Sequence, residues 1–251
     1  MAGGRILCLQ KSASEPGVVL NSILPLAQVL AAISHELRSP LAAIKGSTTT
    51  LLDYQSRLEP EKVAAFLDAI DRETDRLSEM LDDLIALARS QIGVLRLQRA
   101  TLPLAEVLAP LVTEQACQVS GPLVGAEIPE VWVDVDVRRV QRALTFLVQQ
   151  VRANGPVETG VQMLISASSQ RVVVRLPEAG ALAVLDQSTH LLEQTEYLDD
   201  PVLRRSGQAV LRLLLSRAVL ELHGGQLWFE DQPTSVSAYV SLPCVEFVEV
   251  E

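Results

Sequence analysis

The chain has 251 residues, of which 48% are hydrophobic and only 4% aromatic, and it carries a formal net charge of −10. A chain of this length forms one large or two ordinary domains, and its composition requires a mainly aliphatic core. The negative charge argues against direct binding to DNA or RNA, because such binding needs a basic surface that displaces counterions.

Neither a metal site nor a membrane segment is indicated. Cys8, Cys117 and Cys244 are scattered and lack the spacing of zinc ligands or of a disulfide framework. The most apolar stretch, residues 18–33, contains polar residues and a proline, so it lacks the unbroken run of about 20 apolar residues that a membrane span requires. We therefore expect a cytoplasmic protein, and the sequence leaves open whether the chain is complete or the end of a longer one.

The N-terminal part combines a short segment with a long helix. Residues 1–19 form a separate N-terminal segment, in which residues 5–10 could form a strand. From about Leu20 to Gln55 the pattern is helical, because apolar residues recur in steps of three and four. Pro40 lies inside this helix and should bend it, because proline removes a backbone hydrogen bond. The apolar stripes are Leu30, Leu37, Ile44 and Leu51, with Ala27, Ser34, Leu41 and Thr48 beside them.

A second helix is expected after a turn, with Pro60 in its first position and its end near Gln91. It keeps the same spacing through Val63, Leu67, Ile70, Thr74, Leu77, Leu81, Leu84 and Ala88. The two helices make an antiparallel hairpin over residues 20–95, whose apolar seam is too long to remain exposed. Pairing with the hairpin of a second copy buries the seam, so we expect a homodimer with a four-helix bundle.

The pattern changes after Gly93, and residues 96–251 are expected to form a second domain. Strands are expected at residues 131–137, 162–166, 171–176, 226–230 and 236–242, and helices at residues 138–151 and 208–222. Helices that alternate with mostly antiparallel strands indicate an α/β sandwich. The predicted fold class is therefore α+β, a helical hairpin followed by an α/β sandwich.

The most specific feature of the chain is Ser-His-Glu-Leu-Arg-Ser-Pro-Leu at residues 34–41. A histidine that accepts phosphate needs a nucleophilic ring nitrogen, an acceptor that holds the other nitrogen, and access to the ring. His35 follows a seam position, so we expect it on the surface of the bundle. Glu36 is adjacent and can serve as acceptor and base for the ring proton. Ser39 lies one helical turn beyond His35 on the same side.

This segment resembles the dimerisation and phosphotransfer domain of sensor histidine kinases, over about residues 20–93. The resemblance implies that His35 accepts a phosphoryl group, that Glu36 assists, and that the partner is a response-regulator receiver domain. Family members usually carry Thr or Asn at the position of Ser39, where the side chain can orient a water for dephosphorylation of the regulator. Ser39 keeps a hydroxyl group, and phosphatase activity stays open.

Residues 131–242 resemble, in their layout, the ATP-binding domain of the same kinases. The resemblance implies ATP and magnesium as cofactors, but the residues that would handle them are altered. Gln150 stands where an asparagine holds magnesium, and a longer side chain displaces the ligand oxygen. Glu178 and Gly180 stand for the aspartate and first glycine of the adenine site. Leu182 replaces the second glycine, and its side chain is expected to crowd the nucleotide.

Two further elements are altered. The lid at residues 192–197 keeps one aromatic residue, Tyr197, and the phosphate loop at residues 206–213 has a single glycine, Gly207. Phosphate loops need backbone N–H groups that a Cβ atom does not obstruct. Four altered elements predict a degenerate domain that is poorly suited to bind ATP and magnesium.

Three functions stay open at this point. The chain is a kinase core that phosphorylates His35 from ATP, a pseudokinase that carries phosphohistidine in a phosphorelay, or a catalytically inactive homologue. In the last case it is a dimeric scaffold or regulator of an active kinase. His190 and His223 lack ligand spacing and are expected to be non-catalytic. The sequence identifies neither the input signal nor the response regulator, nor whether phosphorylation is within or between subunits.

Overall fold

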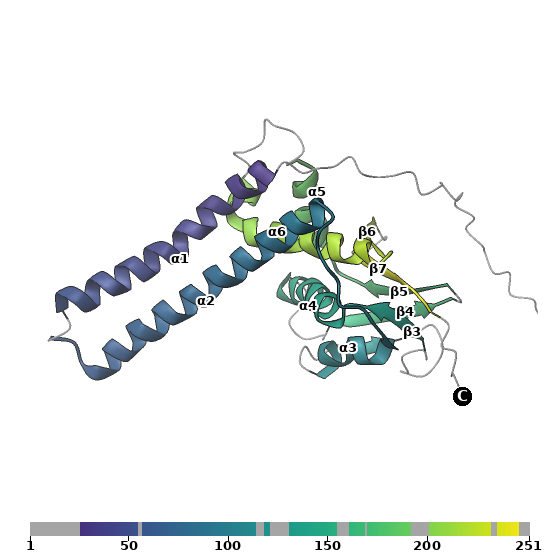
Figure 1. Cartoon of the computed structure of the whole chain (residues 1–251), viewed down its shortest axis with the longest axis horizontal. Coiled ribbons are helices and arrows are strands. Elements are labelled where there is room, and N and C mark those ends of the chain that lie inside the picture. The colour runs from purple at the N-terminus through teal and green to yellow at the C-terminus, as the bar shows by residue number, and fades with distance from the viewer. Residues whose placement is uncertain are drawn as a thin grey trace, which may run out of the picture.

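A long helical hairpin projects from an α/β domain in a computed structural model of the protein (Figure 1). The structure describes residues 26–54, 57–113, 118–120, 131–154, 161–168, 170–191, 201–231 and 235–245. The strand expected at residues 5–10 and the lid at residues 192–197 lie outside these residues. None of the helices that the structure describes is both long and apolar enough to cross a membrane.

The hairpin consists of α1 (Leu26–Tyr54) and α2 (Pro60–Gln91), which lie side by side (Figure 1). Pro60 is in the first turn of α2, as predicted, where its missing N–H group costs no hydrogen bond. The helix α1 continues through Pro40, which is buried. At the other end, Gly93 has a φ of +68°, which lets the chain turn out of α2.

The α/β domain contains a five-stranded sheet in the order β2-β4-β5-β7-β6, in which β2 and β4 are parallel and the other pairs antiparallel. A smaller sheet pairs β1 with β3. The strands of the large sheet are β2 (Gln118–Ser120), β4 (Gln162–Ala167), β5 (Arg171–Leu176), β7 (Val236–Pro243) and β6 (Gln226–Asp231). Those of the small sheet are β1 (Ala100–Pro103) and β3 (Trp132–Val135).

Helices pack on the large sheet to form the sandwich, namely α3 (Leu104–Thr113), α4 (Val137–Asn154), α5 (Gly180–Leu191) and α6 (Pro201–Leu222). Alternate residues of β5 are buried on the helical side, as the period of a strand requires. The fold class expected from the sequence is confirmed, including the β4–β5 and β6–β7 pairs. The sequence analysis missed β1, α3, β2 and α5.

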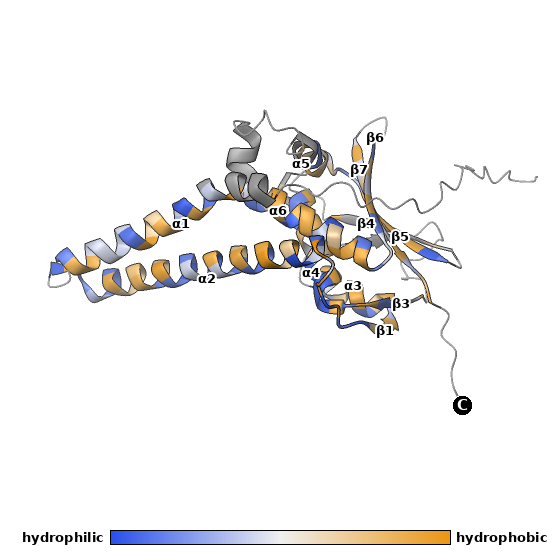
Figure 2. Cartoon of the chain, turned by 45° about the horizontal axis from the view of Figure 1, so that its top comes forward, coloured by the Kyte–Doolittle hydropathy of each residue, from blue (hydrophilic) through white to orange (hydrophobic). Residues whose placement is uncertain are grey.

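The helix α6 connects the two parts of the molecule, because it lies against both α1 and α2 (Figure 1). Ile33 of α1 and Leu84 and Leu87 of α2 are buried in the same apolar cluster as the core of the α/β domain. Farther from that domain, hydrophobic residues recur along α2 (Figure 2). Leu67 and Leu81 of α2 are 55% and 57% exposed, so part of the apolar stripe has no cover within the described residues of the chain.

The end of α6 is fixed by a buried histidine and a close backbone crossing. His223 is 1% exposed, its Nε2 accepts the backbone N–H of Asp136 at 2.9 Å, and its Nδ1 lies 2.7 Å from the carbonyl oxygen of Val219. A Cβ atom on Gly225 would lie 2.2 Å from the carbonyl oxygen of Ser241 in β7. His223 thus has a structural role at the end of α6.

Candidate functional site

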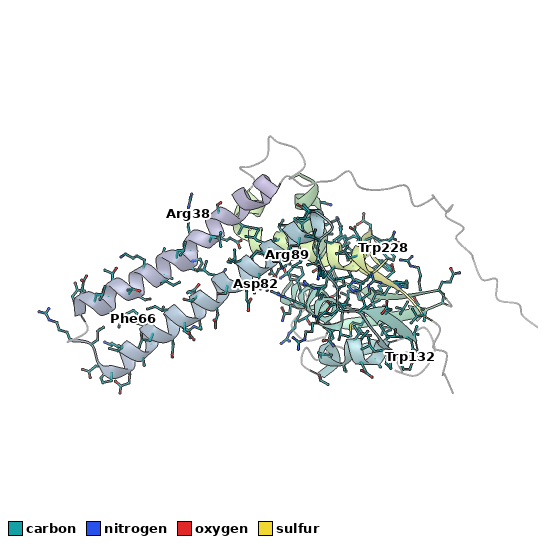
Figure 3. All side chains as sticks on the ribbon, viewed as in Figure 1. Arg38, Phe66, Asp82, Arg89, Trp132 and Trp228 are labelled. Carbon is teal, nitrogen blue, oxygen red and sulfur yellow. The ribbon has the colours of Figure 1, made fainter. Side chains whose placement is uncertain are left out.

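The predicted phosphoacceptor segment lies in the middle of α1, where the helix passes the α/β domain. Ile33 is fully buried in the shared core, and Pro40 is also buried, two turns further along the helix. Ser34, Arg38 and Ser39 are exposed, and Figure 3 shows Arg38 pointing away from the hairpin. The segment therefore has one face against the protein and one face open to solvent.

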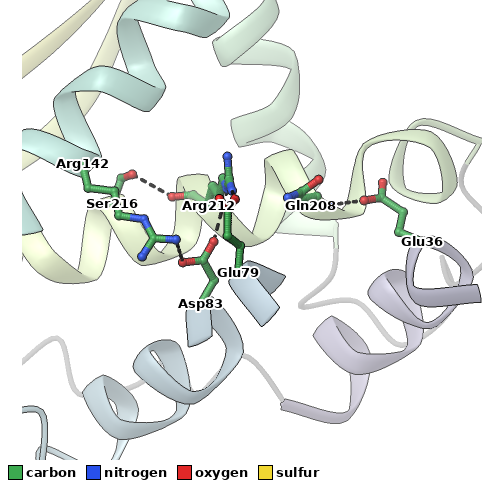
Figure 4. Close-up of polar contacts among 7 residues, drawn as sticks. All are labelled: Glu36, Glu79, Asp83, Arg142, Gln208, Arg212 and Ser216. Carbon is green, nitrogen blue, oxygen red and sulfur yellow. Dashed lines mark hydrogen bonds and ion pairs between the residues drawn. The ribbon is translucent and has the colours of Figure 1, made fainter. Parts of the chain in front are cut away.

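Glu36 connects this segment to the α/β domain. Its Oε2 atom accepts a hydrogen bond from the backbone N–H of Gln208 in α6 at 2.7 Å (Figure 4). Hydrogen bonds to an ionised acceptor are short and about twice as strong as neutral ones. The structure places His35 in α1 beside Glu36, but the side chain of His35 is outside the described part, so its predicted exposure stays a prediction.

A second polar contact between the hairpin and the α/β domain centres on Asp83 of α2, which is 1% exposed. Its Oδ1 atom lies 2.7 Å from Nη2 of Arg142 in α4, an ion pair without an aligned hydrogen bond. Its Oδ2 atom accepts a hydrogen bond from Nε of Arg212 in α6 at 3.2 Å. Arg212 also contacts Glu79, with 2.7 Å between Nη2 and Oε2 (Figure 4).

The electrostatics of Asp83 depend on both arginines. Burial raises the pKa of the Asp83 carboxyl above its ordinary value of 3.8, and the charges of Arg142 and Arg212 oppose this rise. A buried carboxylate is costly when it is unpaired, and removal of one partner destabilises the state that buries it. The close approach of α2, α4 and α6 therefore requires the two guanidinium groups.

A cavity of about 680 Å³ lies beside this network, lined by residues of α2, α3, α4 and α6. Polar residues that line it include Arg138, Thr145, Gln149 and Ser216, and its apolar lining includes Phe146. It lies between the hairpin and the α/β domain, and none of the four predicted nucleotide positions lines it.

The predicted nucleotide positions lie on three different parts of the α/β domain. Gln150 is half-buried near the end of α4, and Gly207 is buried in the first half of α6. Gly180 begins α5, with no atom within 4 Å of a Cβ added there. Glu178 is exposed and has a φ of +59°, a left-handed conformation that is uncommon for a residue with a side chain.

The expected phosphate loop is wrong, because its residues are helical. Residues 206–213, expected to form a loop, belong to α6, which begins at Pro201. Val210 and Leu211 are 1% and 0% exposed and pack in the core, as inward-facing residues of an amphipathic helix do. Leu182 is also fully buried in the core.

The sequence analysis did not identify Asp83, Arg142, Arg212 or the amide of Gln208. One signal for Asp83 was available in the sequence. Met80, Asp83, Leu84 and Leu87 have the spacing of a single helical face, and all four are buried. An acidic residue on such a face needs a cationic partner from another element. Within the described residues, no group of three or more His, Cys, Asp or Glu residues is placed to hold a metal ion.

Comparison with known proteins supports the relationship that residues 34–41 suggest. Residues 26–93 match the family described as the His Kinase A (phospho-acceptor) domain. The chain is 28% identical over 220 residues to the probable sensor histidine kinase TcrY of Mycobacterium tuberculosis. It is 30% identical over 223 residues to the histidine-protein kinase BaeS of Escherichia coli. These matches cover 86% and 85% of this chain but only 45% and 46% of the relatives, so the chain spans less than half of their length.

Solved structures share the fold. The histidine kinase AdeS of Acinetobacter baumannii matches with a TM-score of 0.55 and 16% identity, over 83% of this chain and 97% of that one. The histidine kinase ThkA, solved in complex with the response regulator protein TrrA, matches with a TM-score of 0.55 and 18% identity, over 88% and 62% of the two chains. The hairpin and the α/β domain thus have the architecture of a histidine-kinase core.

Proposed function

We propose that the chain is a sensor histidine kinase relative in which His35 carries a phosphoryl group in two-component signalling, on the basis of the match of residues 26–93 to the phospho-acceptor domain and of its similarity to sensor histidine kinases. The group is exchanged with an aspartate of a response-regulator receiver domain. The observation that carries the proposal is the segment at residues 34–41, held on the described middle part of α1. The complex of ThkA with the response regulator protein TrrA supports this class of partner.

The proposed exchange is a phosphoryl transfer between an acyl phosphate and an imidazole. The neutral ring nitrogen of His35 attacks the phosphorus atom, a P–N bond forms, and the P–O bond to the receiver aspartate breaks. The aspartate leaves as a carboxylate. Glu36 accepts the N–H of the other ring nitrogen and stabilises the positive charge that develops on the ring. The exposed Ser39 hydroxyl group lies close enough in sequence to orient a water for the hydrolytic reaction.

The proposal assigns no step to ATP or magnesium. The environment of residues 206–213 argues against a backbone phosphate cradle, because the N–H of Gln208 already donates to Glu36, and Val210 and Leu211 are buried in the core. The side chain of Gln150 is one methylene longer than the asparagine of the family. We therefore propose that the α/β domain is a degenerate ATP-binding domain, that the chain is a pseudokinase, and that the phosphoryl group comes from a receiver domain in a phosphorelay.

Transfer of radioactive phosphate from a phosphorylated receiver domain tests this function. We expect label on the wild-type protein that is acid-labile, as phosphohistidine is, and no label on His35→Gln. His190→Gln is the matched control, because it removes a histidine outside the phosphoacceptor segment. Label that persists in His35→Gln would place the phosphoryl group on another residue and contradict the proposal.

Thermal unfolding with magnesium and ATP tests the second part. A ligand that binds the native state raises the unfolding temperature, by an amount that grows with its concentration. We expect no shift at millimolar nucleotide. A clear shift, together with label on His35 from radioactive ATP, would establish the kinase core in place of the pseudokinase.

A second candidate function is a scaffold that pairs with an active kinase, and one observation on the hairpin bears on it. Leu41, Leu67 and Leu81 are more than half exposed on the hairpin, which suits an interaction with another helical hairpin. In the proposed function that hairpin is a second copy, which completes the four-helix bundle. A scaffold that pairs with an active kinase would use the same face. This candidate would stand if neither a receiver domain nor ATP labels the protein.

A further inference from the structure

We propose that the cavity beside Asp83 is a binding site for a small zwitterion with an apolar body, the chemistry shared by apolar amino acids and short apolar peptides. Three features of the cavity indicate this ligand: its size, the separation of charge along its lining, and two charged side chains without a partner among the described residues. Such a site is independent of the proposed function, because no residue of the phosphoacceptor segment lines the cavity.

The cavity has the dimensions of a small-molecule site. Its volume of about 680 Å³ lies within the range of roughly 300–1,000 Å³ that is usual for ligand pockets. The apolar part of its lining includes Phe146, Leu215 and Val219, which are at most 9% exposed. Surfaces of this kind favour a ligand with an apolar body, because the transfer of apolar area out of water is favourable.

The charges along the cavity are separated by sign between two helices. Those that α2 contributes are all acidic, and those that α4 contributes are all basic. The acidic residues are Glu79, Asp82 and Asp83, and the basic residues are Arg138, Arg139 and Arg142. The two sets meet at the ion pair between Asp83 and Arg142, whose Oδ1 and Nη2 atoms are 2.7 Å apart. A ligand at this place meets negative charge from one helix and positive charge from the other.

Most of these charges are already neutralised by the protein itself. The pairs are Asp83 with Arg142 and Arg212, Glu79 with Arg212, and Arg139 with Asp136. Asp82 and Arg138 form neither an ion pair nor a hydrogen bond within the part of the chain that the structure describes. Asp82 is adjacent to Asp83 in α2, and Arg138 is one helical turn before Arg142 in α4. The two free charges therefore come from the two helices that the central ion pair joins.

The free charges define the two ends of the ligand. An ammonium group would donate to the carboxylate of Asp82, and a carboxylate group would accept N–H groups from the guanidinium of Arg138. Both side chains are exposed, so the ligand gains these contacts without breaking an ion pair of the protein. A ligand with a single charge satisfies only one of the two side chains, which favours a zwitterion over a simple anion or cation.

Calorimetric titration of the full chain with leucine and with the dipeptide leucyl-leucine tests the site. We expect at least one of these zwitterions to bind in the millimolar range or more tightly, and the stronger of the two identifies the source of the ligand as a free amino acid or a peptide. Two matched compounds are N-acetyl-leucine, which lacks the ammonium group, and leucine amide, which lacks the carboxylate. Each should bind about tenfold more weakly or worse, since each loses a charge-assisted contact.

Two substitutions test whether the zwitterion occupies this cavity. Arg138→Gln and Asp82→Asn each remove one free charge and should each weaken its binding by about tenfold or more. The controls are Arg152→Gln in α4 and Asp75→Asn in α2, because both residues are exposed and neither lines the cavity. These two variants should bind the zwitterion as the wild type does.

The compounds and the variants combine into a sharper test. Asp82→Asn should leave the weak binding of N-acetyl-leucine unchanged, and Arg138→Gln should leave that of leucine amide unchanged, because each compound already lacks the matching group. Binding of neither zwitterion at tens of millimolar would overturn the proposal. Equal binding of leucine and N-acetyl-leucine would show a site for a simple anion and would also overturn it.

Equal weakening by the cavity variants and the control variants would place the ligand outside the cavity and contradict the proposal. None of these titrations involves phosphate. A protein that takes up no label at His35 therefore contradicts the proposed function alone, and the titrations still decide whether the cavity binds a zwitterion.

Discussion

Glycine at position 225 is required by a close approach of two backbones. A Cβ atom there would lie 2.2 Å from the carbonyl oxygen of Ser241 and 3.0 Å from that of Leu220, and neither oxygen can rotate away. We predict that Gly225→Ala lowers the free energy of unfolding by about 2–3 kcal/mol through overpacking. Denaturation in urea, followed by circular dichroism, measures the loss.

Gly46→Ala is the matched substitution in open space, because no atom lies within 4 Å of a Cβ added at position 46 of α1. It should stabilise the protein by about 0.5–1 kcal/mol, since alanine is the better helix former. Equal effects of the two substitutions would show that the crossing at Gly225 is looser than the structure indicates.

His223 should make stability depend on pH. Burial lowers its pKa below the ordinary value of 6.5, because the buried ring takes up a proton less readily than the same ring in the unfolded chain. A lowered pKa in the folded state means that the contribution of His223 is fully present above pH 6.5 and is lost as the pH falls toward the folded-state pKa. The protonated ring would also direct an N–H group at the backbone N–H of Asp136.

We therefore predict that the urea midpoint of the wild-type protein decreases between about pH 7.5 and 5 more steeply than that of His223→Gln. The difference between the two slopes isolates His223 from the carboxylates, which titrate in both proteins. Parallel slopes would contradict the assignment of His223 as a buried neutral ring.

Single functional residues could be predicted where they belong to a contiguous sequence motif. The segment around His35 is such a motif, and the family comparison supports its interpretation. Asp83 could not be found in the same way, because its partners Arg142 and Arg212 lie on other helices, and α2 is rich in acidic residues that are exposed. Only the position of Asp83 beside Leu84, on the apolar face of α2, distinguished it from the exposed acidic residues of that helix.

The apolar face of α2 gives a prediction at the scale of elements. Leu81 is 57% exposed in the single chain, so a charge there does little harm to the monomer. In a four-helix bundle the same residue is buried, and an unpaired buried charge costs about 3–5 kcal/mol. We predict that Leu81→Asp converts a dimer into a monomer in light scattering.

Ala65→Asp is the control for that experiment, because residue 65 is exposed on another side of α2. It introduces the same charge and should leave the dimer intact. A dimer that survives Leu81→Asp would exclude this face as the dimer interface. Leu37 is a less suitable position, because it packs against the core within the chain.

The helices differ in how well the sequence predicted them. The helix α2 was predicted to its ends, because proline opens it and a glycine follows it. The start of α6 was placed too late, at Gln208, whereas the helix begins at Pro201, a residue suited to the first helical position. The helix α3, which contains Pro110, was missed, although Leu104, Val107 and Leu111 have helical spacing and are buried.

The arrangement of the whole molecule could not be derived from sequence patterns. Glu36 and Gln208 are 172 residues apart along the chain, and Asp83 and Arg212 are 129 residues apart. Periodicity reports which face of each helix is apolar, but it does not report which helix of another domain covers that face. The burial of Ile33 in the core shared with the α/β domain is therefore a finding of the structure alone.

The connection between the hairpin and the α/β domain limits how far these two parts can separate. The amide of Leu95 still bonds to the carbonyl of Arg89 in α2, whereas the amide of Gln98 already bonds to the carboxylate of Asp136 beside α4. Only two residues separate these bonds, and at about 3.3–3.6 Å per residue they provide a tether of roughly 10 Å. The α/β domain therefore stays within this short reach of the base of α2 while both hydrogen bonds hold.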